Sequence, residues 1–448
     1  SYTISLKTIP ANDTISWVIK MKQVSIKKYD VIVVGGGASG LMAAITASRQ
    51  GAKVVVIDHL NRIGKKILST GNGKCNYTNL EQGISNYRGN DPAFVLPIFS
   101  QFNEKDTLNF FQELGIYPKI KNGYVYPNCE QATAILEVLE MELRRLKVAV
   151  LCNTSLTKIN RCREGYTVLA QSLSEDQKDE IGSVVELSGK SLIFATGLYA
   201  GRNTGCDGSA NPYIEELGHH FIDIVPALVQ LKSNQSFFKN LAGIRAEITL
   251  KLYIDGVKIG EESGELQLTD YGISGIVVFQ LSRYAGKACK DGRKVQAVID
   301  FMPQMDALHL QDYLMQSFQS AQNKTVGEAL IGLFSKKLIP VLLKRSTVNP
   351  NLKSSELSLK LCIKLVTMIK EFTVDIVGTK DYQDAQVCAG GISTAEINNQ
   401  TLMSNYADHV FFAGELIDID GKCGGYNLQW AWSSGYVAGK HAAEVGKC

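Results

Sequence analysis

Residues 30–58 read DVIVVGGGASGLMAAITASRQGAKVVVID, and this stretch decides the fold. An apolar run rich in β-branched residues leads into a glycine loop, an alanine-rich segment follows, and a second apolar run ends at Asp58. The two apolar runs predict buried strands, and the segment between them has the composition of a helix. Strand, loop, helix and strand in this order form a βαβ unit, so the sequence predicts a parallel α/β sheet.

The glycine loop has the spacing of a nucleotide-binding turn. Gly35, Gly37 and Gly40 stand in the pattern GxGxxG, between the predicted strand and the predicted helix. The first glycine permits a tight turn, the second lets the backbone approach a pyrophosphate, and the third lets the helix pack on the strand. Asp58 follows about twenty residues later, where an acid accepts hydrogen bonds from a ribose. The unit therefore predicts a dinucleotide site, with the phosphates at the helix N-terminus.

Length and composition limit the possible classes of protein. The 448 residues are too many for one compact core and indicate two or three domains. Apolar residues make up 45% of the chain, so the chain is expected to fold. The net charge is only +3, so the protein offers no strong electrostatic field to attract nucleic acid or an anionic membrane. A small-molecule substrate is the expectation, with no nucleic-acid partner, and the oligomeric state is left open.

The cysteines and histidines carry no metal-site pattern. Ten cysteines contain no CxxC pair, and the six histidines have neither zinc-ligand spacing nor the order of a serine triad. We therefore expect reduced thiols and no metal. Reduced thiols, with no signal-peptide pattern and no membrane segment, predict a cytoplasmic protein.

Two later strands indicate which dinucleotide binds. SLIFATG (residues 191–197) and HVFFAGE (residues 409–415) each end in a glycine-bearing turn, and Gly424, Gly425, Tyr426 and Asn427 follow the second. This combination resembles the FAD-binding flavoproteins of the glutathione-reductase type. The resemblance implies that the Gly-Glu pair holds the ribityl chain and that a helix N-terminus faces the flavin pyrimidine, where its dipole would stabilise negative charge.

Three longer motifs narrow the resemblance. GKKILSTGNGKCNYTN (residues 64–79), TDYGISG (269–275) and AGGISTAEIN with FFAGELIDIDGKCGGYN (389–427) are similar to the bacterial BaiN-like and YhiN-like flavoproteins, which are NAD(P)/FAD-dependent oxidoreductases. The similarity runs from Tyr29 to the C-terminal helix. It implies an α/β protein with a discontinuous Rossmann-like FAD-binding domain of the glutathione-reductase type, an inserted β-barrel-like domain and a small helical subdomain.

Each part of this fold is assigned to a range of residues. Residues 29–217 and 387–448 are predicted to form the FAD-binding domain, residues 218–304 and 371–386 a β-rich inserted substrate domain, and residues 305–370 the helical subdomain. Residues 1–28 are interpreted as an N-terminal extension, with Met21 as a natural start.

The resemblance also assigns cofactor contacts. Beyond the three spaced glycines and Asp58, these are Ala38, Ser39, Lys66, Gly71, Gly73, Lys74, Cys75, Asn76, Leu156, Thr196, Gly197, Gly414, Glu415, Gly425, Tyr426, Asn427 and Leu428. This chain departs from the family pattern at Lys74, where an arginine is usual, so a point charge replaces a bidentate guanidinium. Cys423 stands where a threonine is common.

No catalytic residue is fixed by the sequence, and three are candidates. Asp270 and Tyr271 lie on a glycine-flanked turn of the inserted domain, where they could reach over the flavin or simply form the turn. Tyr426 could line the pocket or pack. Cys75 lacks a partner cysteine two residues away, which favours a structural role over redox chemistry.

The expected function is hydride transfer between flavin N5 and a small organic substrate. The resemblance leaves two directions open, oxidation of an amine such as aminoacetone by oxygen, and NAD(P)H-driven reduction of an activated double bond. No second GxGxxG unit is present, so NAD(P)H would be a transient reductant. Two alternatives stay open, a flavin-dependent RNA-modifying enzyme and a flavin-binding protein without turnover.

Overall fold

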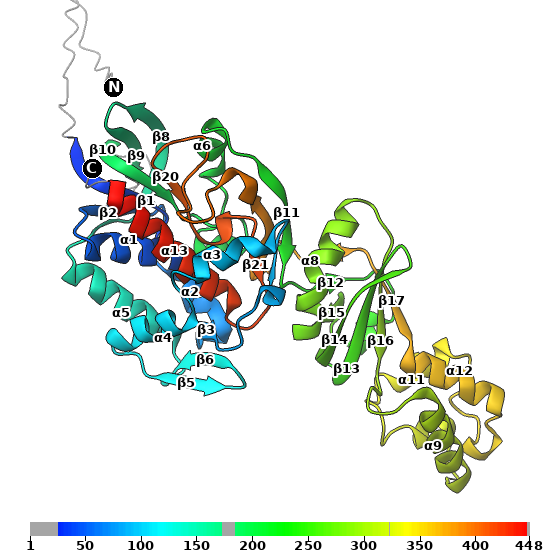
Figure 1. Ribbon diagram of the computed structural model, residues 1–448. Helices are drawn as coiled ribbons and strands as arrows, with labels where there is room; N and C mark the ends of the chain where they lie inside the picture. Colours follow the sequence, from blue (N-terminus) through cyan, green and yellow to red (C-terminus); the bar gives the residue numbers. More distant parts are fainter. Residues whose placement is uncertain (1–25, 173–183, 322, 446–448) are drawn as a thin grey trace, which may run out of the picture.

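The computed structural model describes residues 26–172, 184–321 and 323–445, which form two lobes of unequal size (Figure 1). The interpretation of residues 1–20 as upstream sequence therefore lies outside the described residues. The larger lobe holds both ends of the described chain, and the smaller lobe is inserted between them.

The larger lobe is built on a parallel sheet. Its strands are β7 (Ala149–Leu151), β2 (Val54–Ile57), β1 (Lys27–Val34), β10 (Val184–Phe194) and β20 (Val410–Phe412). Each pairs in parallel with its neighbour, and the apolar residues of β2 and of the second half of β1 are buried on both faces, as expected for such a sheet. Because β20 comes from the far end of the chain, the lobe is discontinuous in sequence. The first half of β10 continues into an antiparallel meander with β9 (Gly165–Ser172) and β8 (Thr154–Cys162).

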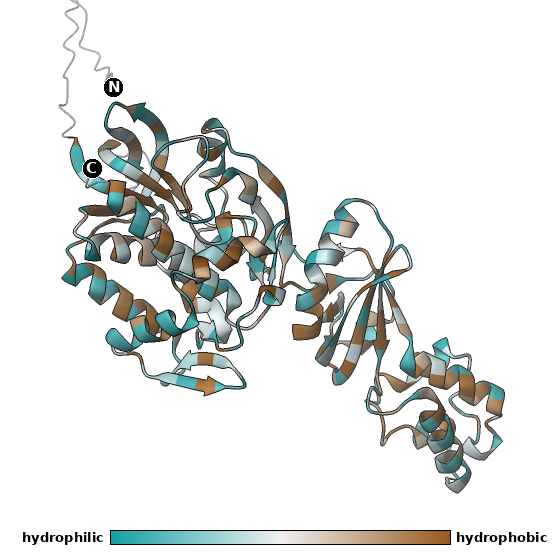
Figure 2. Cartoon of the chain, viewed as in Figure 1, coloured by the Kyte–Doolittle hydropathy of each residue, from teal (hydrophilic) through white to brown (hydrophobic). Residues whose placement is uncertain are grey.

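Smaller elements surround this sheet. The helices are α2 (Lys65–Ser69), α3 (Val95–Phe99), α4 (Glu104–Glu113), α5 (Ala132–Arg145) and α6 (Asn211–Glu216). The short strands β3 (Thr78–Asn79), β6 (Tyr124–Pro127) and β5 (Pro118–Lys121) form a second sheet, and β4 (Tyr87–Arg88) pairs with β21 (Asp420–Gly421). Apolar residues concentrate in the central strands of both lobes (Figure 2).

Two helices cross at close range over the parallel sheet, α1 (Ala38–Arg49) and α13 (Tyr426–Val445) (Figure 1). A Cβ atom on Gly435 would lie 2.3 Å from the Ser39 carbonyl oxygen, and one on Gly439 would lie 2.3 Å from the Ala43 carbonyl oxygen. Only glycine leaves room for such backbone contact, so α13 is held directly against the helix that begins at the glycine loop.

The two lobes are joined by a pair of antiparallel strands, β11 (Phe221–Ala227) and β19 (Val387–Ile392). In the smaller lobe the strands are β12 (Leu231–Lys232), β13 (Arg245–Ile254), β14 (Val257–Leu268), β15 (Gly272–Ser274), β16 (Val295–Asp300), β17 (Phe372–Ile376) and β18 (Gly378–Thr379). β17 and β18 are the two edges of this antiparallel sheet, yet only Val377 separates them. One stretch of chain therefore joins both edges, and the sheet closes into a barrel.

Helices cover the barrel and extend beyond it. α8 (Ile276–Lys290) packs between the barrel and β11, and α7 (Phe238–Leu241) is a short turn at its edge. The outer helices are α9 (Ala307–Ser320), α10 (Val326–Ala329), α11 (Ile339–Arg345) and α12 (Leu359–Lys370). Their buried side chains belong to the same hydrophobic core as the barrel strands. The predicted fold class, a parallel Rossmann-like sheet with additional antiparallel and helical parts, is confirmed.

The helix crossing gives a stability prediction. Gly439→Ala should lower the stability of the larger lobe by about 1–3 kcal/mol, because the added methyl group meets the fixed Ala43 backbone. The measurement is the midpoint of thermal unfolding followed by circular dichroism. Gly332→Ala is the control, since nothing lies within 4 Å of its added methyl group. Equal midpoints for the two variants would contradict this account of the crossing.

Candidate active site

A cavity of about 840 Å³ opens at the carboxyl ends of the parallel strands. The β1–α1 loop, the ends of β2 and β10, strand β6 and the start of α13 contribute to its walls. Ile276 and Phe279 of α8 also line it, so the smaller lobe closes one part of the cavity. Ligands of open α/β folds bind at this edge of the sheet.

The glycine loop forms the floor of the cavity. A Cβ atom on Gly35 would lie 2.6 Å from the Ala195 carbonyl oxygen, and one on Gly40 only 1.9 Å from the Gly35 carbonyl oxygen. By contrast, the nearest atom to a Cβ on Gly37 is 4.0 Å away, so a side chain there would project into open space. Gly37 is also the N-cap of α1 and has no side-chain cap. Its position fits a pyrophosphate placed on free amide groups.

Asp58 organises the same loop. Its Oδ2 accepts a hydrogen bond from the Gly36 amide at 2.8 Å, and its Oδ1 accepts one from the Leu60 amide at 2.8 Å. A carboxylate has about four lone-pair positions, so two remain for other donors. Because Asp58 lines the cavity, those positions fit the hydroxyl groups of a ribose.

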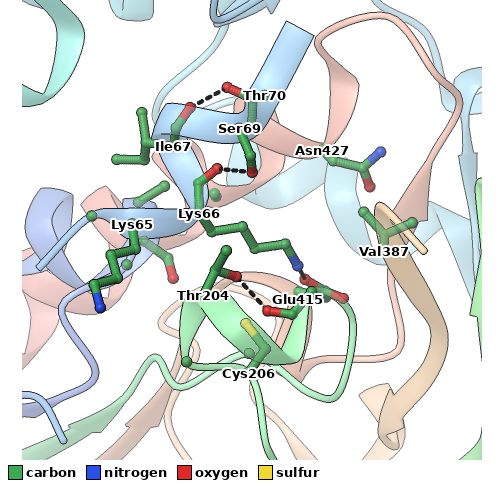
Figure 3. A pocket seen from close by; sticks show the side chains of 18 of the residues that line it. Lys65, Lys66, Ile67, Ser69, Thr70, Thr204, Cys206, Val387, Glu415 and Asn427 are labelled. Carbon is green, nitrogen blue, oxygen red and sulfur yellow. Dashed lines mark hydrogen bonds and ion pairs between the residues drawn. The ribbon is translucent and has the colours of Figure 1, made fainter. Parts of the chain in front are cut away.

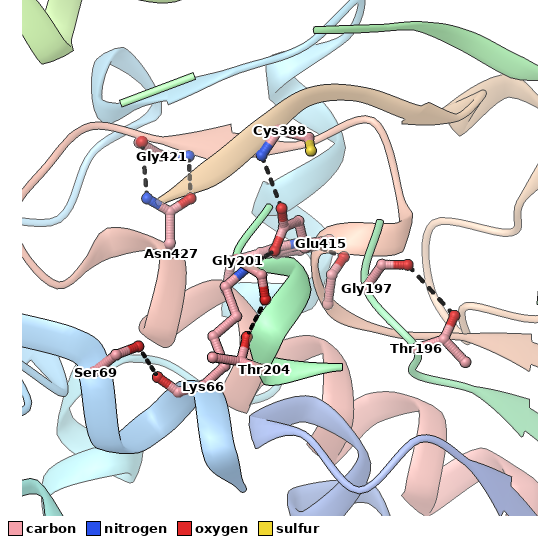
Figure 4. Close-up of polar contacts among 12 residues, drawn as sticks. Lys66, Ser69, Thr196, Gly197, Gly201, Thr204, Cys388, Glu415, Gly421 and Asn427 are labelled. Atoms are coloured by element: carbon pink, nitrogen blue, oxygen red, sulfur yellow. Dashed lines mark hydrogen bonds and ion pairs between the residues drawn. The ribbon is translucent and has the colours of Figure 1, made fainter. Parts of the chain in front are cut away.

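Lys66 and Glu415 form an ion pair across the cavity (Figure 3). The Lys66 Nζ lies 2.6 Å from Glu415 Oε2, while Glu415 Oε1 accepts a hydrogen bond from the Cys388 amide at 2.7 Å (Figure 4). Burial lowers the pKa of Lys66, but the neighbouring Cys206 and Glu415 groups raise it, and the net pKa lies above its usual value. Lys66 is therefore a fixed cation at the centre of the site.

The start of α13 is shaped by a second set of contacts. The Asn427 side chain accepts from the Gly421 amide at 2.8 Å and donates to the Gly421 carbonyl oxygen at 2.9 Å (Figure 4). Gly424 and Gly425 have φ angles of +135° and +93°, which side chains rarely tolerate. These contacts fix the backbone where the N-terminus of α13 faces the cavity.

Most of the predicted cofactor contacts lie together. The residues that line the cavity are Gly35, Gly37, Ala38, Ser39, Asp58, Lys66, Gly71, Asn76, Leu156, Thr196, Gly197, Glu415, Gly425, Asn427 and Leu428. Their roles as cofactor ligands stay predictions. The polar groups that line the cavity, the open space beside Gly37 and the cavity itself fit FAD.

Six predicted contacts do not line the cavity, namely Gly40, Gly73, Lys74, Cys75, Gly414 and Tyr426. Gly40 packs against the loop backbone, and Lys74 points to Glu130 at 3.5 Å. Cys75 is fully buried with a φ angle of +55°, and burial raises the pKa of its thiol to about 12. Gly414 is held by hydrogen bonds from its amide to Ser434 and from the Trp430 indole to its carbonyl oxygen.

The three catalytic candidates also lie outside the cavity lining. Asp270 and Tyr271 stand at the turn between β14 and β15, and the Lys380 ammonium group lies 4.4 Å from the centre of the Tyr271 ring. Tyr426 donates a hydrogen bond to the Glu81 carbonyl oxygen at 3.2 Å and contacts the Tyr87 ring edge-on. This placement favours packing for Tyr426.

Sequence reasoning missed several residues of the cavity. Tyr124 and Tyr126 of β6 line it, as do Ile276 and Phe279 of α8. A Tyr-x-Tyr alternation in a short strand puts both rings on one face and was the one available signal. Nothing in the sequence of α8 shows which of its faces meets the other lobe.

The smaller lobe is clamped to the loop that precedes α13. Cys423 donates its amide to Gln280 Oε1 at 3.1 Å, and Gln280 Nε2 donates to the Cys423 carbonyl oxygen at 3.4 Å. Beside this clamp, Arg283 and Asp420 form a buried ion pair at 2.9 Å. Burial raises the pKa of Asp420 to about 6, although Arg283 and Arg88 act in the opposite direction. These contacts hold α8 over the cavity.

Within residues 26–172, 184–321 and 323–445, no group of three or more His, Cys, Asp or Glu side chains is placed to hold a metal ion. In the same ranges, no helix combines the length and the apolar character that a membrane crossing requires.

The parallel sheet, the glycine loop on a cavity and the fitting donor set define a FAD-dependent oxidoreductase with a Rossmann-like domain. Residues 29–441 match the family described as the HI0933-like protein Rossmann domain, and the chain belongs to this family. The resemblance drawn from the sequence motifs is thereby confirmed.

Named relatives cover almost the whole chain. The 3-dehydro-bile acid delta(4,6)-reductase of Clostridium scindens is 40% identical over 416 residues, 92% of this chain and 98% of the relative. The ribosomal RNA dihydrouridine synthase of Haemophilus influenzae is 28% identical over 420 residues, 91% of this chain and 96% of the relative. Among solved structures, the open conformation of a flavocytochrome c3 fumarate reductase has a TM-score of 0.50 at 14% identity and covers 99% of this chain and 85% of that chain. This last likeness concerns the fold alone.

The open position at Gly37 gives a binding prediction. Gly37→Val should weaken FAD binding at least tenfold, because the side chain fills the space expected for the pyrophosphate, while the backbone there is extended and accepts any residue. Flavin fluorescence titration gives the affinity. Gly332→Val adds the same side chain at another open glycine and should bind FAD like the unchanged protein. An unchanged affinity in Gly37→Val would place the pyrophosphate elsewhere.

Proposed function

We propose that this protein reduces a carbon–carbon double bond conjugated with a carbonyl group, with NAD(P)H as the transient reductant. The observation that carries the proposal is the wall that α8 adds to the FAD cavity. Ile276 and Phe279 of α8 line one part of the cavity with apolar side chains, together with Leu228 after β11 and Val387 of β19. Such a surface suits the carbon skeleton of an unsaturated ketone better than a charged amine.

The relatives support the same chemistry. The name of the Clostridium scindens enzyme describes a 3-oxo compound with double bonds at positions 4 and 6, which are conjugated with the ketone. The name of the Haemophilus influenzae enzyme describes reduction of the uracil ring, where the double bond is conjugated with a ring carbonyl. Both names therefore describe the reduction of carbon–carbon double bonds that are conjugated with a carbonyl group.

FAD, once bound and reduced, would supply that hydride. The chain's own residues would bind the cofactor and orient the substrate. The loop around Gly37 and the Asp58 carboxylate would hold the phosphates and the ribose, and Lys66 with Glu415 would fix the middle of the cofactor. Ile276 and Phe279 would contact the substrate and exclude water, which strengthens the electrostatic interactions inside the site.

Reduction of a uracil ring in RNA is a second candidate function, because the relative with that name aligns over nearly its full length. It uses the same chemistry but requires a polyanion to reach the cavity. We favour the small unsaturated ketone, since the relative with 40% identity acts on a compound of that kind. Amine oxidation and flavin binding without turnover are outcomes of the same test.

The test is an anaerobic spectral titration. NADPH or NADH should bleach the flavin absorption bands, and a steroid 4-en-3-one or 4,6-dien-3-one should restore them with formation of the saturated product. Bleaching without reoxidation by any unsaturated ketone, but with reduction of uracil in ribosomal RNA, would favour the second candidate. If neither nicotinamide bleaches the flavin while an amine does, the proposal is wrong.

A further inference from the structure

Adding a hydride to a conjugated double bond leaves the α-carbon in need of a proton, so a reductase of this kind needs a proton donor. This inference rests on the proposed function. Lys66 is held by Glu415, and His59 lies 3.7 Å from Asp207 beside Asp58. The lining also holds Cys206, which neighbours Lys66, and the cations Arg62 and Lys65. Away from all these groups, the weak acids that line the cavity among the described residues are Tyr124, Tyr126 and Cys423.

Tyr124 and Tyr126 lie two residues apart on β6 and both face the cavity. A Cβ atom on Gly424 would lie 2.9 Å from a ring carbon of Tyr124, so this ring borders the start of α13. The Tyr126 ring lies 3.6 Å from the corresponding position of Gly71 and borders the earlier loop. Neither hydroxyl group has a hydrogen-bond partner among the described residues, so each is free to meet a ligand.

The two tyrosines differ in where they lie relative to the Gln280–Cys423 hydrogen bonds that join the lobes. Gln280 holds Cys423, the residue before Gly424, and Phe279 packs in the same cluster as Cys423. The apolar wall of α8 is thus held against the loop that Tyr124 borders. Tyr126 is displaced from this junction toward Gly71.

We propose that the Tyr124 hydroxyl group is the catalytic proton donor to the α-carbon of the substrate. The β-carbon gains the hydride, the π electrons of the double bond shift toward the carbonyl group, and the α-carbon takes the proton of the Tyr124 O–H bond. The phenolate oxygen then regains a proton from water. NAD(P)H is oxidised to NAD(P)⁺, the double bond is reduced, and one proton is consumed.

Burial and Cys423 raise the pKa of both tyrosines, so the assignment to Tyr124 rests on the position of its ring beside Gly424. Burial raises the pKa of Tyr124, and the nearby Cys423 and Glu81 raise it further. The hydroxyl group therefore keeps its proton at neutral pH and gives it up only to a strong base such as the carbanion-like α-carbon. Cys423 is less suited, since it packs against the apolar cluster of Val225, Leu228 and Val387.

The experiment compares Tyr124→Phe with its matched control Tyr126→Phe in the FAD-loaded full chain. For Tyr124→Phe, FAD affinity by fluorescence titration and the rate of bleaching by NADPH should stay within about twofold. The rate of reoxidation by a 4-en-3-one should fall about 10²-fold or more, the usual contribution of a positioned acid. Tyr126→Phe should keep all three values within about threefold.

A second variant tests proton donation itself. Tyr124→His carries an acid with a pKa near 6.5, so reoxidation should recover in part below about pH 6.5 and decline above it. Unchanged reoxidation in Tyr124→Phe, or a comparable loss in Tyr126→Phe or Cys423→Ser alone, would overturn the assignment. If the unchanged protein reduces no unsaturated carbonyl compound, the proposed function fails instead, independently of Tyr124.

Discussion

The contact of backbone with backbone around the glycine loop is the constraint on which the rest of the structure depends. Gly40 lets α1 start directly on the loop, and Gly435 and Gly439 let α13 lie against α1. With α1 and α13 in van der Waals contact, the N-termini of both helices point to the cavity. A dinucleotide can then meet one helix dipole at its phosphates and the other at its distal end.

The second constraint is that the chain builds the cavity from two lobes. The larger lobe supplies the polar side chains that line the cavity, and α8 of the smaller lobe supplies apolar side chains. Gln280 and the buried Arg283–Asp420 pair fix this helix on the loop before α13. Breaking a buried pair leaves an uncompensated charge, which opposes separation of the lobes. The polar and the apolar walls of the cavity are therefore positioned by the same loop.

Much of the fold could be predicted because its signals are local. The spacing of Gly35, Gly37 and Gly40 and the acid at Asp58 reflect contacts within one βαβ unit, and the structure has that unit. The cavity-facing tyrosines of β6 could not be found in this way, because their role depends on distant segments that meet them in space. The candidates Asp270 and Tyr271 show the converse, since a polar turn looks the same in sequence whether or not it reaches the cavity.

The most direct test of the account is reconstitution of the purified full chain with FAD, followed by absorption and fluorescence. One FAD per chain, with a shifted absorption band and altered flavin fluorescence, is the predicted result, because the cavity of about 840 Å³ is lined by residues of both lobes. A protein that binds no FAD at micromolar concentrations, while keeping its native circular dichroism, would contradict the central claim.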